Sequence, residues 1–149
     1  MTRSDVADEP RTRRASLPGW SAGVPGVLPL QVLLIDDEVE QLLPLADVLR
    51  RAGLAPMIAT SDDEALFHVQ TAPPDVVVVD AEMAARSLLG RLRAVVSNLP
   101  CVLMISVPAH DARLAAMLAM AGVACIEKPV DAQHLIRLIS DTRPFTATP

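Results

Sequence analysis

Five residues of this chain have types that suit phosphoryl transfer, and all five follow apolar runs typical of buried strands. They are Asp36, Asp37, Asp80, Ser106 and Lys128. We interpret Asp80 as a nucleophile that would form an aspartyl phosphate. Asp36 and Asp37 would hold Mg²⁺, which prefers oxygen ligands, because neighbouring carboxylates are unfavourable without a cation. Ser106 and Lys128 would contact the added phosphoryl oxygens.

The lysine count strengthens this interpretation. Lys128 is the only lysine among the 13 basic residues of the chain. An ammonium group is a compact point-charge donor, suited to a phosphoryl group beside a metal. A serine at the end of a strand is ordinary by itself, and a lysine before a proline is usually a surface residue. The complete set therefore carries the hypothesis, rather than any single member.

Alternating strands and helices must position these residues. The apolar runs predict strands at 30–35, 55–60, 75–80, 101–105 and 123–127, and helices at 39–51, 61–70, 84–97, 111–121 and 131–141. This alternation is typical of an α/β fold with a doubly wound, five-stranded parallel sheet. The carboxyl ends of such strands meet at one edge, where ligands bind. The sequence thus predicts that the polar residues share one site.

Two helix details are open to test. Pro44 falls inside the predicted 39–51 helix, where proline costs about 3 kcal/mol, so the helix either kinks or begins near Leu43. Ser61 and Glu64 form a capping box, in which serine caps the helix and glutamate reaches back. Helix initiation also accounts for the acids at 62 and 63, which we therefore do not assign to a metal.

Length and composition indicate a single domain. We expect a folded region at 30–141, a disordered tail at 1–29 with four prolines, and a short C-terminal tail at 142–149. A net charge of −5 argues against a nucleic-acid partner. No apolar run is long enough to span a bilayer, and the N-terminus lacks a secretory signal, so we expect a cytoplasmic location. Cys101 and Cys125 read as small buried hydrophobes in a reducing compartment.

Four short motifs resemble those of a known family. They are Leu34-Ile35-Asp36-Asp37-Glu38, Val79-Asp80 with Met83, Ile105-Ser106, and Lys128-Pro129. As a set they resemble the receiver domains of two-component response regulators, in particular the single-domain, chemotaxis-regulator-like members. The resemblance covers about residues 30–141. It implies the flavodoxin-like strand order 2-1-3-4-5 in a three-layer α/β/α architecture.

The resemblance also implies a role in phosphorelay signalling rather than an enzymatic one. A histidine kinase or phosphotransfer protein would donate a phosphoryl group to Asp80. The backbone carbonyl of Glu82 would join Asp36, Asp37 and Asp80 around Mg²⁺, and the Lys128–Pro129 peptide bond would be cis. Output would pass to a downstream protein, with the 111–121 helix, the last strand and the 131–141 helix as the docking face. The resemblance leaves undecided whether the chain forms a homodimer, and it implies no insertion into a membrane.

Departures from the family pattern keep an alternative open. Alanine follows Met83 where the family usually has proline, the next loop looks about three residues short, and Cys125 occupies the aromatic switch position. The chain could therefore be a pseudo-receiver that binds proteins without phosphorylation. A phosphatase of the haloacid dehalogenase type is a third reading, because Asp80-Ala81-Glu82 faintly echoes its signature. That signature belongs on the first strand, which argues against it.

Overall fold

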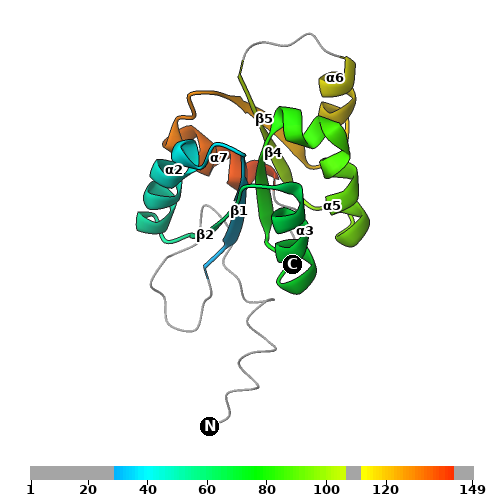
Figure 1. Ribbon diagram of the computed structural model, residues 1–149. Helices are drawn as coiled ribbons and strands as arrows, with labels where there is room; N and C mark the ends of the chain where they lie inside the picture. The colour runs from blue at the N-terminus through cyan, green and yellow to red at the C-terminus, as the bar shows by residue number, and fades with distance from the viewer. Residues whose placement is uncertain (1–28, 107–111, 143–149) are drawn as a thin grey trace, which may run out of the picture.

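The computed structural model describes residues 29–106 and 112–142 and shows one parallel sheet (Figure 1). Its strands are ordered β2-β1-β3-β4-β5, and every adjacent pair is parallel. The strands are β1 (Gln31–Ile35), β2 (Ala55–Ala59), β3 (Val76–Asp80), β4 (Cys101–Ile105) and β5 (Val123–Glu127). The predicted fold class and the strand order 2-1-3-4-5 are both confirmed.

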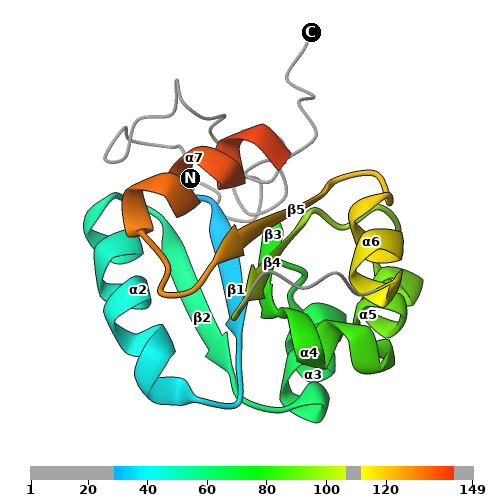
Figure 2. The ribbon, with the colours of Figure 1, turned by 90° about the horizontal axis from the view of Figure 1, so that it is seen from above.

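Helices cover both faces of the sheet, which makes three layers (Figure 2). One face packs against α2 (Val39–Arg51) and α7 (Ala132–Thr142). The other face packs against the remaining segments: α3 (Asp62–Thr71), α4 (Ala81–Met83), η1 (Ala84–Leu88), α5 (Leu89–Val95) and α6 (Ala112–Leu118). No helix within the described ranges is both long and apolar enough to cross a membrane.

The central strand β3 explains the run of four valines. All five residues of β3 are buried. Successive side chains point to opposite faces, so Val77 and Val79 join the core under α3 to α6, while Val76 and Val78 join the core under α2 and α7. A strand covered on both faces needs a continuous apolar sequence, which is what the chain supplies here.

The starts of two helices settle details that the sequence prediction left open. Helix α2 runs from Val39 through Pro44 to Arg51, so the alternative start near Leu43 is wrong. The cap of α3 is present, because the Ser61 hydroxyl accepts a hydrogen bond from the Glu64 backbone N–H at 3.1 Å. The Glu64 carboxylate, however, reaches Thr60 N–H at 2.6 Å, one residue before the position that a standard capping box uses.

The segment after β3 departs most from the prediction. A helix was expected at 84–97, but helical structure begins at Ala81, directly after Asp80, and ends at Val95. It is broken at Arg86 and Ser87, and the Ser87 φ of 83° is in the left-handed region that glycine favours. Helix α6 is also shorter than the predicted 111–121 helix. Of the predicted tails at 1–29 and 142–149, residues 1–28 and 143–149 lie outside the described residues, and Thr142 is the last residue of α7.

Candidate phosphoryl-transfer site

The parallel register brings the predicted site residues to one edge of the sheet. Ile35 of β1 pairs with Val79 of β3. The next residue along the chain is an aspartate in both cases, Asp36 after Ile35 and Asp80 after Val79. Asp80 pairs in turn with Met104 of β4, next to the strand end at Ile105. Ile105 also accepts a hydrogen bond from the Lys128 backbone N–H at 2.8 Å. Residues that lie 92 positions apart in the chain therefore become neighbours.

Lys128 joins the two buried carboxylates. Its Nζ lies 2.8 Å from Asp36 Oδ2 and 2.9 Å from Asp80 Oδ1. The three side chains are mostly buried, with 16% of Lys128, 2% of Asp36 and 12% of Asp80 exposed. Burial alone lowers the pKa of Lys128, but its hydrogen bonds with the two aspartates and their charges outweigh burial and raise that pKa. Lys128 is therefore protonated and neutralises one of the two carboxylates.

Backbone donors fix the orientation of both carboxylates. Asp80 Oδ2 accepts hydrogen bonds from the N–H groups of Glu82 and Met83, each at 3.1 Å, so Asp80 caps the helix that begins after it. Asp36 Oδ1 accepts from the Glu38 N–H at 3.0 Å. Each aspartate thus uses one oxygen for the backbone and the other for Lys128, and neither side chain is free to rotate.

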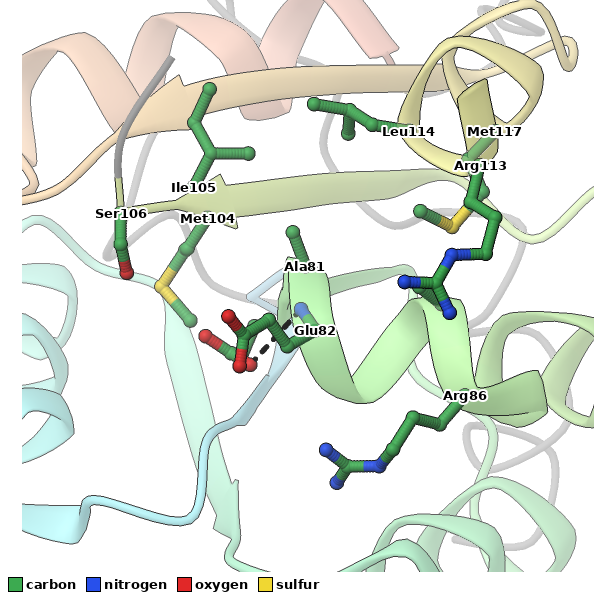
Figure 3. Close-up of a pocket in the computed structure, with 11 residues that line it drawn as sticks. Ala81, Glu82, Arg86, Met104, Ile105, Ser106, Arg113, Leu114 and Met117 are labelled. Carbon is green, nitrogen blue, oxygen red and sulfur yellow. Dashed lines mark hydrogen bonds between the residues drawn. The ribbon is translucent and has the colours of Figure 1, made fainter. Parts of the chain in front are cut away.

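The remaining predicted site residues lie at the rim. Asp37, Glu82 and Ser106 are exposed, and the Lys128–Pro129 bond is cis, as the resemblance implies. Ser106 lines a cleft of about 350 Å³ together with Asp80 and Glu82. Figure 3 shows Ser106 and Met104 at one end of this cleft, with Glu82 between them and the far wall. The neighbouring loop, which includes Pro108, lies outside the described residues.

The charges and donor atoms fit a magnesium ion. Asp36, Asp37 and Asp80 carry three negative charges, of which Lys128 balances one, so two remain for a divalent cation. All candidate ligands are oxygen atoms, which Mg²⁺ prefers. In residues 29–106 and 112–142, no cluster of three or more His, Cys, Asp or Glu side chains is gathered for a metal. Asp36, Asp37 and Asp80 are therefore not gathered into a set of three ligands here, and carbonyl and water oxygens would have to supply most of the coordination.

Sequence reasoning missed two cationic residues at the same cleft. Arg86 on η1 and Arg113 on α6 form part of its lining, at the end away from Met104 and Ser106 (Figure 3). Arg86 lies six positions after Asp80, where the helical backbone that begins at Ala81 breaks, because Arg86 (φ −86°, ψ 35°) and Ser87 have non-helical dihedral angles. The sequence prediction began this helix three residues later, at residue 84, and carried no signal for Arg86.

A second cleft lies on the other side of Lys128. It has a volume of about 660 Å³ and lies between α2 and the chain that joins β5 to α7. Its walls are largely apolar, and Ser106 and Lys128 line it too. The apolar wall residues are Pro44, Leu45, Val48, Met104, Pro129, Val130 and Ala132. The site is therefore open from two directions.

The two cysteines differ in their surroundings. Cys101 is fully buried in β4, and burial raises the pKa of its thiol to about 11, with the charge of Arg93 opposing the shift. Cys125, at the expected switch position, is partly buried on β5 and packs against the core under α6. Cys101 is thus a buried hydrophobe as expected, whereas Cys125 is only partly so.

Comparisons with known proteins agree with this architecture. A family model described as response regulator receiver domain matches residues 32–140. A putative response regulator from Chloroflexus aurantiacus is 26% identical with a TM-score of 0.67, and the match covers 76% of this chain and 97% of that one.

Two further solved structures are similar. A response regulator receiver domain protein from Clostridium thermocellum is 26% identical, with a TM-score of 0.63 and coverage of 76% and 93%. One from Methanospirillum hungatei is 19% identical, with a TM-score of 0.67 and coverage of 76% and 92%, and this likeness supports the fold alone. No protein with a curated description matches the chain.

Proposed function

Since this chain belongs to the family of response regulator receiver domains, we propose that it accepts a phosphoryl group on Asp80 in Mg²⁺-dependent phosphorelay signalling. Asp36, Asp37, Asp80 and the backbone carbonyl of Glu82 would hold the metal. Ser106 and Lys128 would bind the transferred group. The chain would act through contacts with other proteins rather than as an enzyme with a diffusible substrate.

One observation carries this proposal: a single ammonium bridges two buried aspartates from separate strands. Lys128 Nζ lies within 2.9 Å of both Asp36 and Asp80, although burying charges is costly unless they are paired. A core built only for stability has no need of this arrangement. A site that must handle phosphoryl oxygens needs fixed cationic donors beside its nucleophile.

We infer that the transfer is an in-line displacement. A carboxylate oxygen of Asp80 forms a bond to phosphorus, while the bond from phosphorus to the leaving group breaks and its electron pair departs with that group. Lys128 then shifts its hydrogen bond from the carboxylate to the phosphoryl oxygens, which carry more charge. Ser106, exposed at the rim, donates its hydroxyl hydrogen to another of these oxygens. Bound Mg²⁺ would neutralise phosphoryl oxygens throughout the transfer.

We infer that the donor is a sensor histidine kinase or a phosphotransfer protein. The apolar cleft beside Lys128, with half-exposed Leu43 and Val39 on the adjoining helix α2, offers a docking surface next to the nucleophile. Output would pass to a downstream protein on the surface formed by α6, β5 and α7, which a second copy of the chain could also use. Nucleic-acid binding and membrane insertion are not part of the proposal, and the proposed location is the cytoplasm.

Phosphorylation with a small donor tests the proposal directly. Intact-mass measurements after incubation with Mg²⁺ and acetyl phosphate should show one added phosphoryl group. The adduct should be lost in Asp80→Asn and in the presence of EDTA. Asp63→Asn, an exposed aspartate at the start of α3, is the matched control and should be phosphorylated normally.

Other outcomes of this experiment would support the two alternative functions, a pseudo-receiver or a phosphatase. The pseudo-receiver reading draws on Cys125, which leaves the switch position without an aromatic ring. That reading would be correct if neither an adduct nor a response of amide NMR signals to beryllofluoride appeared. Continuous hydrolysis of small phosphate esters would instead indicate a phosphatase. Either result would overturn the assignment of Asp80 as a phosphoacceptor in signalling.

A further inference from the structure

We propose that Met104 is a positioning residue for phosphoryl transfer, because its side chain supports the stem of Lys128 on its way to the two buried aspartates. This inference rests on the proposed phosphorylation of Asp80 and adds one residue to that site. Met104 acts through Lys128 in this role, rather than by contact with the phosphoryl group. It does not belong to the set of five residues that the sequence suggested.

Met104 lies beside Asp80 on the same face of the sheet. The two residues are register partners on the adjacent strands β4 and β3. Val78 and Met104 both belong to the core under α2 and α7, and Asp80, two residues after Val78, faces the same side because side chains alternate along a strand. On its other side Met104 pairs with Ile126 of β5, which belongs to the same core. Met104 therefore stands between the nucleophile and the strand that leads to Lys128.

The stem of Lys128 has to cross β4 to reach the aspartates. The Lys128 backbone N–H donates to the carbonyl of Ile105 at 2.8 Å, so its main chain lies alongside the end of β4. Its Nζ, however, lies 2.9 Å from Asp80 on β3 and 2.8 Å from Asp36 beyond β1. Neighbouring strands are about 4.8 Å apart, so β5 and β3 are separated by roughly 9–10 Å. The β4 side chain under this stem is that of Met104, because Ile105 belongs to the opposite core.

Met104 is also part of the wall that the two clefts beside the site share. Of the residues that the structure describes, Met104 and Ser106 line both clefts, whereas Asp80 lines the first and Lys128 the second. Ser106 is exposed, but only 2% of Met104 is, so Met104 forms the buried part of this wall. Figure 3 shows its side chain extending from β4 toward Glu82. Truncation of Met104 would join the clefts where Lys128 meets Asp80 and would admit water to that contact.

A supported stem matters for the chemistry proposed here. Lysine carries a point charge on a flexible four-carbon stem, so its ammonium keeps one position only if the surroundings fix that stem. Donors stabilise a transition state most when they are already in place before the charge develops. Methionine is unbranched and adaptable, which suits an irregular space between two clefts. Loss of the Met104 side chain would leave Lys128 charged but less firmly held, and phosphoryl transfer to Asp80 would slow.

The mobility of the Lys128 ammonium can be measured without phosphorylation. Lys128 is the only lysine of the chain, so protein labelled on the lysine nitrogen gives a single side-chain ammonium NMR signal. Exchange of the ammonium protons with water, measured in EDTA, reports how firmly the group is held. In Met104→Ala this exchange should be about tenfold faster, because water reaches the charge-assisted hydrogen bonds more often. In Met104→Leu, which nearly conserves the volume, the change should be less than about threefold.

Phosphorylation by acetyl phosphate with Mg²⁺ is then measured on the same full-length proteins. Met104→Ala should lower the rate roughly 10–100-fold, because a displacement of about 1 Å can have an effect of that size, and Met104→Leu should restore it to within about threefold. Val102→Ala is the matched control, since Val102 is buried on the same strand and face but lines neither cleft. Both of its rates should match those of the natural chain. Met104→Val takes the place of Met104→Ala if circular dichroism shows the alanine variant to be unfolded.

Several results would overturn the role of Met104. Unchanged ammonium exchange in folded Met104→Ala would mean that Met104 does not hold Lys128, even if phosphorylation slowed. Faster exchange with unchanged phosphorylation would mean that this support does not matter to the transfer, and equal effects in Val102→Ala would indicate general loosening of the core. If the natural chain is not phosphorylated, the proposed function fails, and the exchange measurement alone decides: faster exchange in Met104→Ala supports the positioning of Lys128, and no change ends it.

Discussion

Replacement of Lys128 by methionine tests the electrostatic core of the site. Methionine is unbranched and of similar length, so Lys128→Met removes the charge and its hydrogen bonds with little loss of packing. Two carboxylates, on Asp36 and Asp80, then remain in a nearly buried setting without their shared cation. We expect the variant to be less stable than the natural chain in the absence of divalent metal.

The structure sets the size of this loss. Removing one partner of a buried ion pair costs about 3–5 kcal/mol, because the other charge is left uncompensated. Asp36 and Asp80 keep their backbone hydrogen bonds from Glu38, Glu82 and Met83, and the site opens to solvent at its rim. We therefore expect the lower end of that range, about 3 kcal/mol, at neutral pH without Mg²⁺.

Urea unfolding followed by circular dichroism in EDTA measures the change. Arg51→Met is the control, since its ion pair with Asp47 is largely exposed and should contribute less than about 1 kcal/mol. Adding Mg²⁺ should restore more stability to Lys128→Met than to the natural chain, because the metal binds the folded state and replaces the missing charge. Lys128→Arg should keep the charge and most of the stability but impair phosphorylation, since a planar fork does not replace a point donor.

A destabilisation below about 0.5 kcal/mol, the size typical of surface substitutions, would refute the reasoning. It would mean that the two carboxylates do not depend on Lys128 for neutralisation. An equal response of both proteins to Mg²⁺ would separately refute the proposal that metal and ammonium compensate the same carboxylates.

Three further predictions concern the fold. Ser87→Gly should raise the unfolding free energy by about 0.5–1 kcal/mol in urea titrations, because a left-handed serine costs about 1–2 kcal/mol and the flexibility of glycine returns part of that; a loss of stability would contradict the kink. Ser61→Ala should cost about 1 kcal/mol by removing the cap of α3, again by urea unfolding. The pKa of Cys101, raised to about 11, keeps the folded thiol neutral while the unfolded thiol ionises near pH 9, so the natural chain should lose about 2–3 kcal/mol relative to Cys101→Ala between pH 9 and 11. Parallel pH–stability curves for the two proteins would contradict that assignment.

The sequence by itself determined the sheet and the polar residues at its edge. Buried parallel strands require continuous apolar runs, and Val76–Val79 is such a run whatever surrounds it. Local signals such as the Ser61 cap act over three residues and can be read directly. The positions of Asp36, Asp80 and Lys128 at strand ends followed from the same pattern, since strand ends in a parallel sheet share one edge.

Only the tertiary structure decided how these residues meet. That Lys128 bridges Asp36 and Asp80, while Asp37 and Ser106 stay at the rim, depends on strand register and on backbone turns that no local pattern encodes. The early helix start at Ala81 is instead a local effect, because the Asp80 carboxylate accepts hydrogen bonds from the N–H groups two and three residues later. The Asp80 carboxylate meets Lys128 only through the strand register, because 48 positions of chain separate the two residues and no local preference reaches that far.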